Sequence, residues 1–133
     1  MASALAAVGR LSVAALSVSA HSSARASIEA AINDNIQTMQ KEDSYFTREW
    51  IEDNTNIDFK TACKSPAGTL NDHLQSVDPE PRLKEITRTF DANTTPGILK
   101  IAYSFQGPEQ NIGEELRVIE MNPNFASQCY TTL

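Results

Sequence analysis

Three side chains of this 133-residue chain have the chemistry of a small acid–base site: His73, Asp58 and Tyr103. A histidine can give or take a proton near neutral pH, because its pKa lies there. A carboxylate such as that of Asp58 becomes a base when burial raises its pKa, and a tyrosine hydroxyl can orient a carbonyl or a phenol. Each residue also has a plainer interpretation, namely a half-exposed helix residue, an exposed strand residue and a core tyrosine with a bonded hydroxyl.

Five further residues would form the apolar wall of such a site: Phe46, Trp50, Leu99, Ile101 and Phe105. The first two are one helical turn apart and share a helix face, and the last three share a strand face with Tyr103. Apolar walls exclude water and so strengthen polar contacts inside a pocket. The same residues would also serve as ordinary core, because aromatic residues at helical spacing more often pack against each other than bind a ligand.

Three helices are expected ahead of the main strands. An amphipathic helix over 27–41 is predicted by a 3.6-residue period of apolar residues, namely Ile28, Ile32, Ile36 and Met39. Asp43 or Ser44 would then cap a short second helix that carries the two aromatic wall residues, because either side chain can accept a hydrogen bond from a free backbone N–H. Thr69 would begin a third helix, which ends before the proline-containing segment 78–81.

Four strands are expected from alternating polar and apolar residues, over 57–63, 82–90, 98–106 and 115–122. The alternation is strongest in the third of these segments and weakest in the second. Asp58 falls in the first segment, on the side opposite Ile57 and Phe59. Helices followed by antiparallel strands predict a single α+β domain over 27–122, with a tail over 123–133.

Composition and charge argue against several classes of protein. The formal net charge of −6 disfavours binding to nucleic acid and to anionic membrane surfaces. No run approaches the roughly 20 apolar residues that a membrane span needs. Cys63 and Cys129 lie outside any CxxC motif or histidine cluster, so we expect neither a metal nor another cofactor. The two cysteines are expected as separate thiols, with one disulfide as the alternative in an oxidising compartment.

The first 26 residues are rich in alanine and serine and contain no acidic residue. Such a composition fits an organellar transit segment, a secretory signal with a small-residue cleavage site at 18–20, or a retained helix or loose arm. The protein would be cytoplasmic if residues 1–26 are retained, and organellar or secreted if they are cleaved. These alternatives stay open, so the fold prediction does not depend on this segment.

Residues 40–59, QKEDSYFTREWIEDNTNIDF, resemble the early segment of the NTF2-like superfamily, which includes the SnoaL-like proteins. In that family an acidic residue ends the first helix, an apolar pair packs from the second helix, and an acidic turn enters the first strand. The resemblance extends to the element order of 27–122. It implies an NTF2-like cone, in which a curved antiparallel sheet wraps around the N-terminal helix beside two further short helices and encloses a cavity. One departure is that we expect four strands, where the family usually has five or six.

Two functions from different classes follow from these expectations. The resemblance implies a pocket for a small apolar molecule, with cofactor-free isomerase, cyclase or dehydratase chemistry. In that chemistry His73 or Asp58 would move protons and Tyr103 would hold the substrate. The alternative is a non-catalytic interaction or assembly subunit that uses its sheet face to form a homodimer or to dock on another protein. Resemblance of fold does not decide between the two, because one fold hosts many functions.

Overall fold

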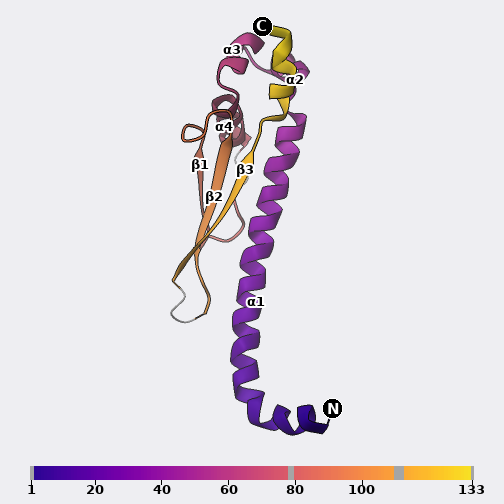
Figure 1. Cartoon of the computed structure of the whole chain (residues 1–133), viewed down its shortest axis with the longest axis vertical. Coiled ribbons are helices and arrows are strands. Elements are labelled where there is room, and N and C mark those ends of the chain that lie inside the picture. Colours follow the sequence, from indigo (N-terminus) through magenta and orange to yellow (C-terminus); the bar gives the residue numbers. More distant parts are fainter. Residues whose placement is uncertain (1, 78–79, 110–112, 133) are drawn as a thin grey trace.

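The computed structural model describes residues 2–77, 80–109 and 113–132, with side chains from 22 to 130 within these ranges. In this part of the chain, four helices precede a three-stranded antiparallel sheet (Figure 1). The elements are α1 (Ala2–Tyr45), α2 (Arg48–Asn54), α3 (Phe59–Lys64), α4 (Pro66–Val77), β1 (Thr87–Asp91), β2 (Leu99–Gln106), β3 (Glu114–Met121) and the 3-10 helix η1 (Asn124–Thr132). The predicted α+β class is confirmed.

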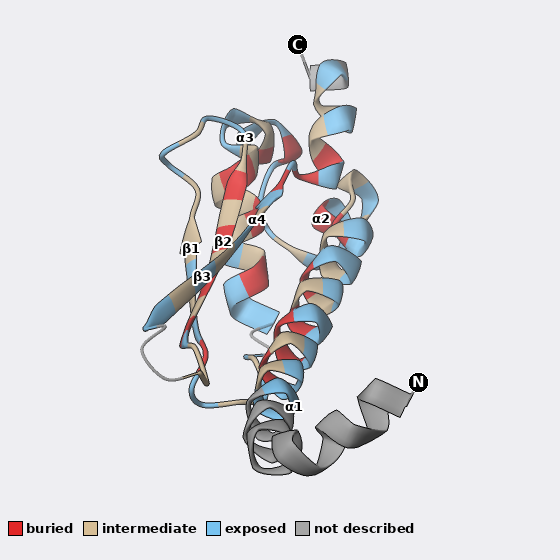
Figure 2. Ribbon diagram, turned by 60° about the horizontal axis from the view of Figure 1, so that its bottom comes forward, coloured by how far each residue is buried: buried red, intermediate tan, exposed pale blue. Residues whose placement is uncertain are grey.

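The helix α1 forms one wall of the hydrophobic core. Its predicted apolar stripe is confirmed, because Ile28, Ile32 and Met39 are buried and Ile36 packs against the core. Figure 2 shows these buried turns along one side of α1. Asn35 is buried on the same face, one turn from Ile32 and from Met39. The core therefore includes a polar side chain that must find hydrogen-bond partners inside the protein.

The first predicted helix, 27–41, is part of the longer α1, which begins at Ala2 and ends at Tyr45. The predicted starts of the next two helices are also wrong. Asp43 and Ser44 lie in the last turn of α1, so they do not cap α2. That role belongs to Thr47, whose hydroxyl accepts a hydrogen bond from the Trp50 backbone N–H at 3.2 Å. The third predicted helix begins at Pro66 and not at Thr69, since proline suits the first helical position, where no N–H donor is needed.

The sheet has the strand order β1-β2-β3 and buries one of its faces. Buried and half-buried residues alternate along β2, and its buried side chains face α1 and α4. The opposite face is uncovered, and on β3 it exposes Leu116 (65%) and Val118 (47%). The predicted strands 98–106 and 115–122 are thus confirmed within a residue. Of the predicted strand 82–90, only the part from Thr87 onward belongs to the sheet, as β1.

The predicted strand over 57–63 is wrong, because residues Phe59–Lys64 form the helix α3. Phe59 and Ala62 are buried, and Cys63 packs against the core. Their spacing of three and four residues fits a helix as well as the two-residue alternation fits a strand, and a short apolar segment cannot distinguish the two. The consequence is a sheet of three strands in the described residues, where four were expected.

The two cysteines form a disulfide bond, so the expectation of separate thiols is wrong. The bond joins Cys63 of α3 to Cys129 of η1, and their Cα atoms are 5.6 Å apart. Separate thiols were expected because the chain has no framework of several cysteines. A single disulfide needs no such framework, only a fold that brings two cysteines together. The segment after β3 is accordingly part of the packed structure, and its Phe125 is fully buried between Phe46 and Phe59.

Charged side chains also join the middle of α1 to β3 and to the loop that precedes it. Arg25 donates hydrogen bonds to Glu109, at 2.7 Å, and to Glu115, at 2.6 Å. One turn further along, Glu29 pairs with Arg117 of β3 at 3.3 Å. Within the ranges that the structure describes, no helix is both long enough and apolar enough to cross a bilayer.

Candidate functional site

His73 occupies a position between three helices that gives it unusual surroundings. It lies on α4, where its ring stacks on Phe46, the residue that directly follows α1, with centroids 4.1 Å apart and planes within 6°. The Trp50 ring of α2 meets it edge to face at 4.8 Å. The side chain of His73 is only 8% exposed. Two predicted wall residues are therefore brought together with the predicted acid–base residue.

Glu42, near the end of α1, is the charged partner of this histidine. Its Oε2 atom lies 3.7 Å from His73 Nε2, which is beyond hydrogen-bond length. Burial lowers the pKa of His73 below its ordinary value, and the Glu42 carboxylate opposes that effect only in part. The ring is consequently neutral at neutral pH, with one nitrogen free to accept a proton.

The nitrogen atoms of His73 are open to solvent although the ring is mostly buried. Every fully buried side-chain nitrogen or oxygen in the described part of the chain has a hydrogen-bond partner. The closest polar atom described for the His73 ring is Glu42 Oε2 at 3.7 Å, so its nitrogens are not among the fully buried atoms. They must reach solvent through the depressions beside the ring.

Two adjoining pockets meet at His73, with volumes of about 400 Å³ and about 340 Å³. They share the side chains of Trp50, Asn54 and His73. The larger one is completed by Glu42, Tyr45, Thr47, Glu49 and Asp53. The smaller one is completed by Phe46, Thr55, Ile57, Thr69, Asp72 and Ser76. We call the two together the His73 pocket, and all of its walls come from helices and the segments that join them.

Tyr103 lies in a different polar group, away from the His73 pocket. Its hydroxyl donates a 2.7 Å hydrogen bond to Asn35 Oδ1, and Arg88 donates to the same oxygen at 3.0 Å. The tyrosine is fully buried, and this burial raises its pKa to about 12, with Arg88 acting in the opposite direction. Because its hydroxyl is buried in the core and already hydrogen-bonded, Tyr103 fits the interpretation as a core tyrosine rather than as a substrate-binding residue.

The other predicted site residues are also separated from His73. Asp58 is exposed and precedes α3 at its N-cap position, without a side-chain capping bond. Leu99, Ile101 and Phe105 point from β2 into the hydrophobic core, where they are at most 6% exposed. The structure thus gathers His73, Phe46 and Trp50 in one place, and it leaves Asp58 and the β2 residues in others.

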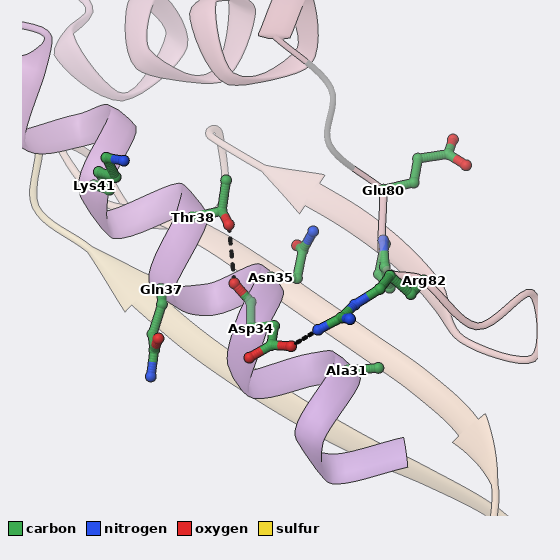
Figure 3. Close-up of a pocket in the computed structure, with 9 residues that line it drawn as sticks. Ala31, Asp34, Asn35, Gln37, Thr38, Lys41, Glu80 and Arg82 are labelled. Carbon is green, nitrogen blue, oxygen red and sulfur yellow. Dashed lines mark hydrogen bonds and ion pairs between the residues drawn. The ribbon is translucent and has the colours of Figure 1, made fainter. Parts of the chain in front are cut away.

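A third pocket of about 450 Å³ lies between α1 and the segment that enters the sheet (Figure 3). An ion pair between Asp34 and Arg82 spans it, and the Thr38 hydroxyl donates to the Asp34 carbonyl oxygen at 3.0 Å. The charges of Asp34 and Arg82, two of the four charged residues that line it, already neutralise each other. This pocket also lacks an aromatic wall, so we regard the His73 pocket as the stronger candidate.

Two residues that shape these sites were missed in the sequence. Glu42 is four residues before Phe46, a spacing that places both on one helix face if α1 continues to Tyr45. The predicted end of the helix near residue 41 concealed this relation. Asn35 falls within the apolar stripe of α1, and a polar residue in such a stripe is a sign of a buried hydrogen bond.

The site offers no converging set of metal ligands. Among the described residues, no group of three or more histidine, cysteine, aspartate or glutamate side chains is arranged to hold a metal ion. Comparison with known proteins adds no relative from which a role could be transferred. No protein-family model, no curated protein and no solved structure matches this chain.

Proposed function

We propose that this protein binds a small molecule in the His73 pocket. The observation that carries the proposal is a neutral, mostly buried histidine whose nitrogens open into a pocket beside a carboxylate. Sites for small molecules are typically concave and apolar, with a few polar groups that fix the orientation of the ligand. Phe46 and Trp50 supply the apolar wall, and His73 and Glu42 supply the polar groups.

The chemistry best suited to this pair is proton transfer without a cofactor. A neutral imidazole takes a proton from a ligand carbon or hydroxyl, and the Glu42 carboxylate stabilises the resulting imidazolium. Isomerase, cyclase and dehydratase reactions all use such a step. Tyr103 and Asp58 have no part in it, because neither lines the His73 pocket.

The proposal does not depend on the NTF2-like cone. The walls of the His73 pocket come from α1, α2, α4 and their connections, whereas the cavity of a cone would lie under the sheet. A cone remains a separate proposal about the curvature of the sheet. Its test is an experimental structure in which the strands bend around α1 and leave a hollow beneath β2.

Screening of a mixed fragment library by NMR tests the proposed function directly. We expect a subset of fragments to shift the imidazole resonances of His73 and the indole N–H of Trp50. The variant His73→Phe should lose this binding while it keeps the stacked ring. The chain has one other histidine, so His21→Phe is the matched control and should bind as the parent does. A library in which no fragment shifts either residue would contradict the proposal.

A non-catalytic interaction subunit is the second candidate, and the uncovered sheet face favours it. Leu116 and Val118 are large apolar residues exposed side by side on one face of β3. A second copy of the chain is the occupant that this function would require. Analytical ultracentrifugation should then show a dimer that Val118→Lys dissociates, and a monomer at all concentrations would exclude a homodimer through this face.

A further inference from the structure

The larger part of the His73 pocket has a charge that suggests the class of its ligand. Three of its lining residues are acidic, namely Glu42, Glu49 and Asp53. Among the described residues, no lysine or arginine lines it. Asn54, Thr47 and the neutral ring of His73 do not offset the negative charge. A ligand that enters this space meets carboxylates on two helices.

The two α2 carboxylates that line the pocket, those of Glu49 and Asp53, form no ion pair among the residues that the structure describes. A neighbouring acid, Glu52, pairs with Arg48 at 2.9 Å and lies outside the pocket. No described ion pair joins Glu49 or Asp53 to a basic side chain. These two residues are four positions apart on one helix, where like charges repel each other and destabilise the helix slightly. A cation bound between them would remove that repulsion.

Aromatic side chains line the same space as the carboxylates. Trp50 and Tyr45 both contribute to the wall. Lys41 already lies over the Tyr45 ring, with Nζ 5.9 Å from the centroid, which leaves Trp50 as the ring for a ligand. Indole is the best aromatic partner for a cation, and quaternary ammonium ligands are typically held by such rings.

His73 is an independent sign that the space receives a ligand. Its side chain is more than nine-tenths buried and lines the pocket, and its polar partner there is the Glu42 carboxylate, 3.7 Å from Nε2. An imidazole in this position can accept a hydrogen bond from a hydroxyl or an ammonium group. The ring therefore adds a specific polar contact to the general attraction of the carboxylates.

We infer that the ligand of the His73 pocket is a small organic cation, an ammonium compound whose apolar substituents pack on Trp50 and whose charge faces Glu49 and Asp53. This inference rests on the proposed function, since it names the class of ligand for the same pocket. It goes further by requiring a positive charge, which a pocket for a neutral apolar molecule does not need.

The test compares two probes of nearly equal shape that differ in charge: choline and its neutral analogue 3,3-dimethylbutan-1-ol. We expect the full-length chain at low salt to bind choline at least about tenfold more tightly, as measured by NMR titration of Trp50. Added salt should weaken the binding of choline but not that of the alcohol. Equal affinity for the two probes, or binding of the alcohol alone, would overturn the inference.

Matched charge variants identify the residues responsible. The double variant Glu49→Gln/Asp53→Asn should weaken choline binding about fivefold, whereas Glu52→Gln on the same helix should change it less than about twofold. An unchanged affinity in the double variant would overturn the inference. So would Ca²⁺ displacing choline, because the carboxylates would then form an inorganic cation site. If neutral fragments still shift His73 while choline does not bind, the proposed function stands without the charge requirement.

Discussion

Two polar side chains packed near α1, those of Tyr103 and His73, differ in whether their polar atoms are hydrogen-bonded within the protein. Tyr103 is sealed in the core, and its hydroxyl is bonded to Asn35 Oδ1, which Arg88 also contacts. His73 is almost as deeply packed, but its nitrogens open into a pocket and Glu42 stands beyond hydrogen-bond length. The comparison shows that burial alone does not identify a functional residue. What distinguishes the two is whether the polar atoms are already satisfied within the protein.

If this distinction is correct, removal of Asn35 Oδ1, which accepts from both Tyr103 and Arg88, should have the largest effect on stability. We expect Asn35→Leu to lower the free energy of unfolding by about 3 kcal/mol, because a buried hydroxyl and a guanidinium lose their common oxygen. Denaturation by urea measures the change. Asn33→Leu, an exposed position on the same helix, is the control and should change stability by less than about 0.5 kcal/mol. Equal losses of stability at the two positions would contradict a structural role for the hydrogen bonds that join Asn35 to Tyr103 and Arg88.

The hydroxyl of Tyr103 should have a smaller effect on stability than Asn35. We expect Tyr103→Phe to cost about 1 kcal/mol, since one hydrogen bond is lost but the ring keeps its packing and Asn35 keeps its bond to Arg88. The same urea experiment measures it. Binding of ligands in the His73 pocket should be unchanged, and a loss of binding would mean that the two polar groups are coupled.

The pH dependence of stability should reveal His73 through the sign of its pKa shift. Its pKa in the folded protein is lower than the ordinary value of 6.5, so the folded protein binds fewer protons than the unfolded chain. The stabilisation from His73 is therefore complete above the unfolded pKa and is lost as the pH falls from that value through the lower pKa of the folded protein. Between about pH 7.5 and about pH 5.5, we expect a loss of less than about 1 kcal/mol that His73→Phe abolishes. A parent and variant with the same pH dependence would contradict the assignment of a lowered pKa.

His73→Phe should have the smallest effect on stability at neutral pH. The phenyl ring can keep the stack on Phe46, and the contact that is lost, with Glu42 at 3.7 Å, is long and weak while the imidazole is neutral. We expect a change of less than about 0.5 kcal/mol in either direction. A loss as large as that of Tyr103→Phe would show that the imidazole has a structural role, and the contrast between the two regions would disappear.

The regular parts of this fold were predictable from the sequence, whereas the site was predictable only in part. The isoleucine stripe of α1 and the alternation in β2 extend over enough residues for their periods to be distinguished. The six residues of α3 fit either period, so the strand predicted there was wrong. His73, Phe46 and Trp50 were chosen from residue type and local spacing, and the structure brings these three together.

The remaining features of the site depend on contacts between distant segments. Glu42 reaches His73 across 31 positions of sequence only because α1 continues to Tyr45 and α4 packs beside it. Asn35 and Tyr103 meet across a separation of 68 residues. No local period encodes such pairs, so the sequence alone could not tell which of the candidates would be satisfied in the core and which would face a pocket.

The covalent link between α3 and η1 has a consequence for how this protein would respond to proteases. The chain between Cys63 and Cys129 forms a closed ring that contains α4 and all three strands. A single cut in the exposed turn between β1 and β2, near Pro96 and Gly97, would open that ring without releasing a fragment. The nicked protein would migrate as one piece under oxidising conditions and separate into two only after a reductant is added.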